Sequence, residues 1–140
     1  MPRFWRRSGP AAILIYMCVT LASAVQTRER DPGWVAPPDV DAMLNPLADL
    51  PDLAAGGAKL FRQRCSSCHA HDGRGTPKAP ALCDPAVQSQ SDGAVFWKMT
   101  TGNTRAGMPA FSYLPEKQRW QLVLHVRALC RADRDSYRPF

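Results

Sequence analysis

Apolar residues recur at helical spacing in the last part of the chain. After Pro115 they follow at three- and four-residue steps: Trp120, Val123, Val126, Leu129 and Cys130. This spacing places them on one face of a helix. Proline suits the first turn of a helix, because the N–H that it lacks has no partner there. The pattern therefore predicts a C-terminal helix that begins at Pro115.

Two shorter helices are predicted upstream. Asp52 can cap a helix over 53–65, where Leu, Ala and Phe supply the apolar positions. Asp92 can cap a second helix over 93–101, which Gly102 ends. No strand pattern or internal repeat is visible, so the chain is predicted to be all-α, with about three core helices.

The remaining segments have the composition of loops. Residues 70–85 are rich in Gly and Pro, and a second loop is expected over 103–114. Residues 25–51 contain five Pro and few large apolar side chains. They are predicted to form a Pro-rich leader that lies extended over the surface or acts as a tether. The folded domain is therefore placed at 52–140.

The first 24 residues have the pattern of a secretory signal peptide. Three Arg and no acidic residue precede an uncharged apolar stretch, and Ala22-Ser23-Ala24 is a small-x-small cleavage site. We expect cleavage before Val25 and export to the periplasm. The alternative is an uncleaved membrane anchor, because the uncharged run over 8–27 has about the ~20 residues that a span needs.

The charge balance argues against nucleic acid as a partner. The net charge is +6, and without the first 24 residues 15 basic residues remain against 12 acidic ones. No run of Lys and Arg is dense enough to neutralise several phosphates. A small domain with 13 Pro and 9 Gly would gain stability from a disulfide or a large cofactor.

The chemistry is concentrated in the motif Cys65-Ser66-Ser67-Cys68-His69. Two Cys three residues apart and an adjoining His suit covalent haem attachment, in which each thiol adds to a vinyl group and the His faces the iron. A zinc site would need a second paired cluster, and a dithiol redox centre normally follows a strand. These two alternatives stay open, and haem c is the favoured cofactor.

Together with residues upstream, this motif resembles the class I c-type cytochromes over 53–131. Gly and Phe stand eight and four residues before the first Cys, as in the first helix of that family: Gly57, Phe61, Cys65, Cys68 and His69. Steps of four place Gly57, Phe61 and Cys65 on one face, where Gly57 lets the last helix approach. The resemblance implies a small cytochrome c fold wrapped around one covalent haem.

Other segments are similar to further parts of that family. Pro80 and Leu82 belong to a segment that resembles the one under the haem, whose Pro carbonyl accepts a hydrogen bond from the axial His69. Met108 stands in a loop that resembles the one carrying the second axial ligand. The helix around 120–129 is similar to the closing helix.

The resemblance makes Met108 the expected sixth ligand of the iron. Met99 is the competitor, although a Met within a helix more often lines a pocket wall. His71 is too close to the first ligand in sequence to reach the opposite face easily, and Met43 has no motif. His125 stands where Tyr is common in the family, and we expect it to pack against the Gly of the first helix.

Several other residues have competing interpretations. Trp97 can donate its indole N–H to a haem propionate or belong to the core. Lys78, Lys98 and Arg105 can steer an acidic partner to the haem edge or merely be solvated. Trp34, in the leader, can bind a partner or fold back over the domain.

Two cysteines are left once the haem thiols and Cys18 of the signal segment are set aside. An oxidising compartment allows Cys83 and Cys130 to form a disulfide. The resemblance places Cys83 in the segment under the haem and Cys130 at the end of the closing helix, which crosses nearby. The alternative is two small buried apolar side chains.

The sequence therefore predicts a periplasmic one-electron carrier with one covalent haem c and His69/Met108 ligation. Its partners are expected to be redox donor and acceptor proteins, such as a periplasmic dehydrogenase or a respiratory chain. It is not predicted to be an enzyme by itself, although it can be the cytochrome subunit of an oxidoreductase. The alternatives are a haem enzyme or ligand sensor with a displaceable Met, and a thiol-redox or metal-binding module built on Cys65 and Cys68.

Overall fold

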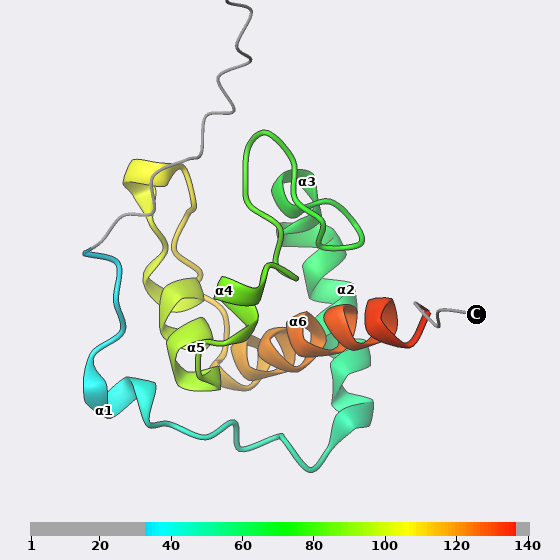
Figure 1. The fold of residues 1–140 in the computed structure, drawn as a ribbon. Helices are drawn as coiled ribbons and strands as arrows, with labels where there is room; N and C mark the ends of the chain where they lie inside the picture. The colour runs from blue at the N-terminus through cyan, green and yellow to red at the C-terminus, as the bar shows by residue number, and fades with distance from the viewer. Residues whose placement is uncertain (1–32, 137–140) are drawn as a thin grey trace, which may run out of the picture.

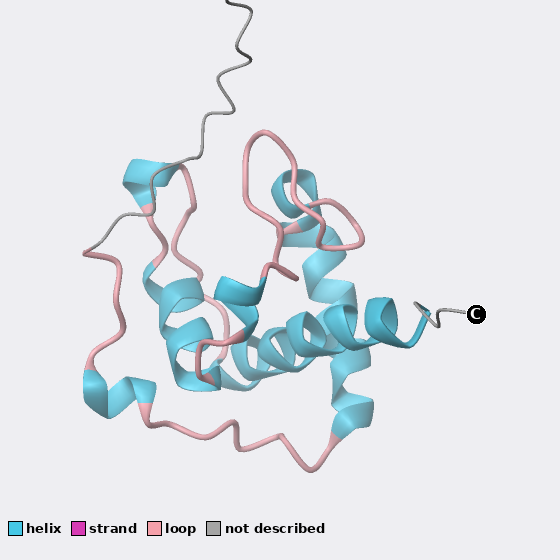
Figure 2. Cartoon of the chain, in the orientation of Figure 1, coloured by secondary structure: helices cyan, strands magenta, loops and turns pink. Residues whose placement is uncertain are grey.

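The computed structural model describes residues 33–136. The expected signal peptide, at 1–24, lies outside these residues, as do the first residues of the leader. The described chain contains six α-helices and two short 3₁₀-helices (Figures 1 and 2): α1 Pro38–Asp41, η1 Pro51–Leu53, α2 Ala54–Arg64, α3 Ser66–His69, α4 Pro85–Gln88, α5 Asp92–Thr101, η2 Thr104–Ala106 and α6 Glu116–Ser136.

No strand is present in the described part of the chain, where β-pairing is limited to two isolated bridges. The predicted all-α class is confirmed. Three helices, α2, α5 and α6, are ten residues long or more. They correspond to the three core helices that the sequence predicts.

The centre of the fold is the crossing of α2 and α6 (Figure 1). Gly57 permits this close approach, because a Cβ there would collide with the backbone carbonyl of Gln121. Phe61, four residues further on, is 1% exposed and lies in the core cluster with Trp120 and Val123. The predicted role of Gly57 in helix packing is thus confirmed by the geometry.

Two predicted helix caps are wrong. The helix predicted over 53–65 is preceded by a 3₁₀ turn that contains Asp52, and no side chain caps α2. The second helix is capped by Ser91, whose hydroxyl accepts a hydrogen bond from the Ala94 N–H at 2.9 Å. Asp92 instead pairs with Arg127 of α6 at 2.8 Å, a tertiary contact that local sequence does not reveal.

One short helix begins at the last residue of the first predicted loop, and another lies within the second. At the end of the first loop, Asp84 caps α4 by accepting from the Ala86 N–H at 2.8 Å, with Pro85 as the first helical residue. In the second loop the side chain of Asn103 accepts from the Ala106 N–H at 3.2 Å and starts η2. Helices this short leave no periodic apolar pattern, so the sequence shows them only through their caps.

The leader packs along the domain from residue 33 onward (cyan in Figure 1), so its interpretation as a tether is wrong for this part. Ala36 and Asn45 are buried, and the Asn45 amide donates to the Trp120 carbonyl at 3.4 Å. The carbonyl of Val40 in α1 fills the space that a side chain at Gly93 would need. The leader therefore contacts both α5 and α6.

His125 packs beside Gly57, as predicted, with its ring centroid 5.1 Å from that of Phe61. Burial lowers the pKa of His125 below its usual 6.5, and the positive charge of Arg62 lowers it further. The folded protein therefore binds fewer protons at this position than the unfolded chain does. Its contribution to stability is present above pH 6.5 and is lost as the pH falls through the lowered pKa.

We accordingly expect His125→Phe to flatten the pH dependence of stability on the acidic side of neutrality. The free energy of unfolding, measured in denaturant at a series of pH values, should fall less steeply below pH 6.5 for the variant than for the wild type. Parallel curves for the two proteins would contradict the assignment of this dependence to His125.

Candidate functional site

One turn of helix carries the thiols and the imidazole. Helix α2 ends at Arg64, and the Cys65 carbonyl then accepts from the backbone N–H groups of Cys68 at 3.1 Å and His69 at 3.0 Å. Both cysteines are unpaired and half-buried. The single turn of α3 therefore holds two thiols three residues apart, with the imidazole directly after the second.

The imidazole of His69 is oriented by a backbone carbonyl. Its Nδ1 lies 3.0 Å from the Pro80 oxygen. Because a carbonyl can only accept, Nδ1 carries the proton, and Nε2 of the neutral ring is left as an electron-pair donor. Burial lowers the pKa of His69, while the bond to Pro80 opposes this shift. The contact matches the one that the family resemblance implies for these two residues.

The loop between α3 and α4 is folded so that Pro80 reaches the imidazole. The Gly75 N–H donates to the His69 carbonyl at 2.9 Å, and the Thr76 hydroxyl donates to the Cys68 carbonyl at 2.6 Å. At Gly75, φ is +81°, and a Cβ would collide with the backbone of Pro80 and Ala81. Sequence reasoning did not identify Gly75 and Thr76, although the Gly- and Pro-rich composition marked their loop.

The loop is fastened to α6 by a disulfide. Cys83 and Cys130 are bonded, with their Cα atoms 5.2 Å apart. This separation lies within the usual range for a disulfide. The pairing considered from the sequence is therefore present in the structure, and it ties the segment after Pro80 and Leu82 to the last helix.

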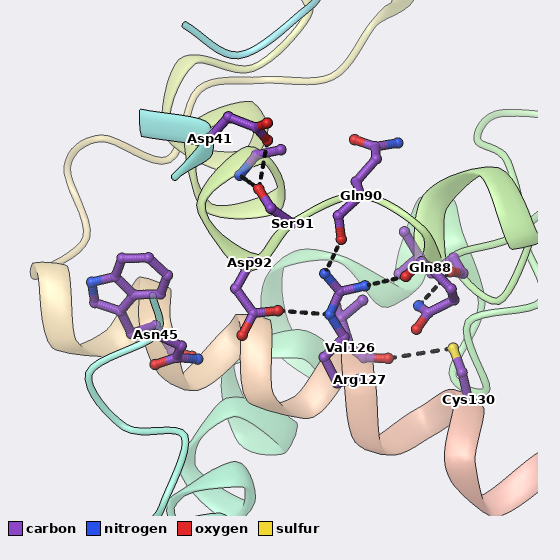
Figure 3. A network of polar contacts seen from close by, with 12 residues as sticks. Asp41, Asn45, Gln88, Gln90, Ser91, Asp92, Val126, Arg127 and Cys130 are labelled. Atoms are coloured by element: carbon purple, nitrogen blue, oxygen red, sulfur yellow. Dashed lines mark hydrogen bonds and ion pairs between the residues drawn. The ribbon is translucent and has the colours of Figure 1, made fainter. Parts of the chain in front are cut away.

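Arg127, one turn before Cys130, links α6 to the segment from α4 to the start of α5 through hydrogen bonds (Figure 3). Its guanidinium donates to the Asp92 carboxylate at 2.8 Å and to the carbonyls of Gln88 at 3.1 Å and Gln90 at 2.6 Å. These three acceptors lie in α4, in the link after it and at the start of α5. Sequence reasoning missed Arg127, because a single Arg on a long helix carries no sign of its partners.

Removal of the disulfide should lower stability without abolishing the fold. The bond spans a sequence separation of 47, for which the chain-entropy model gives about 4 kcal/mol. We expect Cys83→Ala with Cys130→Ala to lose up to about that free energy of unfolding, measured in denaturant. If both residues of the wild type were freely alkylated in oxidised, unfolded protein, the bond would be absent and the prediction would be wrong.

Met108 and Met99 lie in different surroundings. Met108 is half-buried in the loop after α5, where its backbone N–H and carbonyl both pair with Asn103 at 2.9 Å. Met99 is 7% exposed within α5 and belongs to the buried core cluster. Met108 is thus the more accessible thioether.

Three of the predicted site residues pack against one hydrophobic cluster. Cys65, Leu82 and Met108 are all partly buried and pack against the same hydrophobic cluster. Three separate segments therefore contribute incompletely covered apolar atoms around that cluster. The two free thiols and the neutral imidazole with one oriented nitrogen suit haem c, and the Met108 side chain packs against the same cluster as Cys65.

The other candidate residues have different surroundings. Trp97 is half-buried on α5, outside the core cluster. His71 is exposed in the loop after α3, and Met43 is 39% exposed after α1. His125 packs in the α2–α6 crossing.

Two observations concern the alternative uses of the two thiols. Within residues 33–136, no three His, Cys, Asp or Glu side chains are arranged to hold one metal ion. Burial raises the pKa of the Cys65 thiol to about 11, and the neighbouring Cys68 adds to this rise. Reactive cysteines of redox centres have a lowered pKa instead.

Among the described helices, none combines the length and apolar character needed to cross a membrane.

Comparisons with known proteins give a family match and a similar relative. Residues 52–126 match the family model for "Cytochrome C oxidase, cbb3-type, subunit III". This range runs from η1 into α6 and contains the Cys65–His69 motif, Pro80 and Met108. Over 89 residues the chain is 35% identical to the "Cbb3-type cytochrome c oxidase subunit FixP" of Bradyrhizobium sp. (strain ORS 278). The match covers 56% of this chain and 30% of that relative, so the chain spans less than a third of its length.

Proposed function

Since the chain belongs to the c-type cytochrome family of cbb3-type oxidase subunit III, we propose that it is a one-electron carrier with one covalent haem c. When bound, the haem iron supplies the one-electron chemistry. The protein's part is to attach the haem, to orient its axial ligands and to limit access to the iron.

The observation that carries this proposal is the hydrogen bond from His69 Nδ1 to the Pro80 carbonyl, 3.0 Å long, beside two free thiols. A bond of this kind fixes the ring and strengthens the electron donation of Nε2. Cys65 and Cys68 would hold the porphyrin through thioether bonds, and Nε2 of His69 would bind the iron. Leu82 would line the haem on the same side.

Met108 is proposed as the sixth ligand. Its loop is closed by the paired bonds to Asn103, and its side chain is less covered than that of Met99. A thioether favours reduced iron and therefore raises the reduction potential. With His69 and Met108 as its two protein ligands, the iron would leave no site for oxygen and other small ligands, as suits a carrier. Trp97, half-buried on α5, is proposed to face a propionate.

We place the protein in the periplasm, on the strength of the signal-like pattern at 1–24. Its partners are proposed to be redox proteins of a respiratory chain, because the relative from Bradyrhizobium is named as a subunit of a cytochrome c oxidase. If residues 1–24 are retained, the same domain would work at the membrane surface.

The test is a redox titration of the purified protein. Its mass should exceed that of the polypeptide by one haem, and each chain should take up and release one electron reversibly. Uptake of two electrons with no change in visible absorption would instead indicate a dithiol centre at Cys65 and Cys68 and would overturn the proposal.

A further inference from the structure

Trp34 makes an unexpected contact with the domain. Its indole N–H donates to the Gly102 carbonyl at 2.8 Å, across 68 residues of sequence. The side chain is half-buried, and the ammonium group of Lys98 lies 4.8 Å from the ring centroid. The contact therefore combines a hydrogen bond with a cation–π interaction on α5. The Thr101 hydroxyl approaches the same carbonyl only at 3.4 Å.

The carbonyl that Trp34 binds belongs to the peptide group between Gly102 and Asn103. The N–H of this same peptide donates to the Met108 carbonyl at 2.9 Å, and the Met108 N–H returns a 2.9 Å bond to the Asn103 carbonyl. One peptide group thus links the indole to the backbone of Met108. Hydrogen bonds in such a chain polarise one another, so each strengthens the next.

Gly102 also touches the chain that follows Met108. Its φ is +67°, and a Cβ there would lie 2.6 Å from the Ala110 nitrogen and the Pro109 carbonyl carbon. The backbone of Gly102 is therefore in close contact with the backbone of Pro109 and Ala110, which follow the methionine. A shift of the Gly102 carbonyl would be transmitted to both sides of Met108.

We infer that Trp34 is a positioning residue that holds the Met108 loop in place for iron ligation, through the peptide group between Gly102 and Asn103. This inference rests on the proposed function, in which Met108 binds the iron. It assigns a role to the leader that the haem motif does not reveal: the leader sets how readily the sixth ligand leaves the iron.

The decisive variant is Trp34→Phe, which keeps an aromatic ring beside Lys98 and removes the N–H. The oxidised holoprotein is titrated with imidazole, and binding is monitored by the loss of the far-red thioether-to-iron band. The imidazole affinity then measures how easily Met108 is displaced from the iron. We expect the variant to bind imidazole about 3- to 10-fold more tightly, because a change of this size corresponds to the net free energy of one hydrogen bond. The amides of Asn103 and Met108 should also exchange their hydrogens faster.

Asp41→Ala is the matched control. The Asp41 carboxylate accepts a 2.6 Å hydrogen bond from Ser91, which joins the same leader to the opposite end of α5 (Figure 3). This variant also removes one bond between the leader and α5, but at the end remote from Met108. Its imidazole affinity should stay within about 2-fold of the wild type, less than the worth of one hydrogen bond.

The outcomes separate the inference from the proposed function. If the wild type shows the far-red band and Trp34→Phe binds imidazole like the wild type, the positioning role is wrong. An equal increase in Asp41→Ala would also overturn it, because any loosening of the leader would then suffice. Absence of the band in the wild type would instead overturn Met108 ligation itself.

Discussion

Replacing both Cys65 and Cys68 with Ala is expected to leave little folded protein and no visible absorption. The two thiols lie on one turn beside His69, and Cys65, Leu82 and Met108 are only partly buried against the same core cluster. A domain of this size has a small core, so a bound haem would supply a large part of its apolar contacts. Without the two thiols the haem is not held, and the folded state loses the ligand that stabilises it.

Helicity by circular dichroism, thermal unfolding and visible absorption of the exported protein test this expectation. Ser66→Ala with Ser67→Ala is the matched control, because it changes two residues of the same turn and spares both thiols. The Ser66 hydroxyl donates to the Arg62 carbonyl, and exposed Ser67 makes only a long, 3.9 Å contact with the Cys68 sulfur. The control should retain haem and fold. Native helicity and thermal stability in the double Cys variant would show that folding does not depend on haem.

Met108→Ala is expected to remove the far-red band of the oxidised protein, to lower its reduction potential and to open the iron to imidazole. The reason is that a thioether stabilises reduced iron and occupies the sixth position. Met108 is only partly buried, so its removal should disturb the core little. Absorption spectra, a potentiometric titration and imidazole binding measure the three effects.

Met99→Ala is the control for this assignment. Met99 is 7% exposed in the core cluster, so its truncation should cost about 2–5 kcal/mol of stability through the cavity it leaves. The far-red band should nevertheless persist. A band that survives in Met108→Ala and vanishes in Met99→Ala would transfer the ligand role to Met99.

The haem motif and the long helices could be read from the sequence because they depend on local order. Cys65, Cys68 and His69 lie within one helical turn, and their spacing alone fixes their relative places. Gly57 and Phe61 follow the four-residue period that packs α2 on α6. Periodicity and motif spacing are properties of neighbouring residues, so no tertiary information was needed for them.

The failures arose where a distant partner decides the local structure. Asp92 looked like a helix cap, but Arg127 draws its carboxylate away and Ser91 takes over the cap. The leader looked like a tether because of its Pro content, yet it packs against α5 and the residue that follows it. The Val40 carbonyl lies against Gly93, and the Trp34 indole donates to the Gly102 carbonyl. The contacts of Arg127 with Asp92, of Val40 with Gly93 and of Trp34 with Gly102 each join residues more than 30 positions apart, so no local pattern in the sequence reveals them.

The visible spectrum of the purified protein distinguishes a six-coordinate haem c carrier from the alternative functions. We expect low-spin c-type bands in the reduced protein and, after oxidation, the weak far-red band of a thioether bound to iron through Met108. High-spin bands would contradict the carrier and indicate a haem enzyme or ligand sensor. Absence of visible absorption would contradict haem binding altogether and leave a thiol module at Cys65 and Cys68.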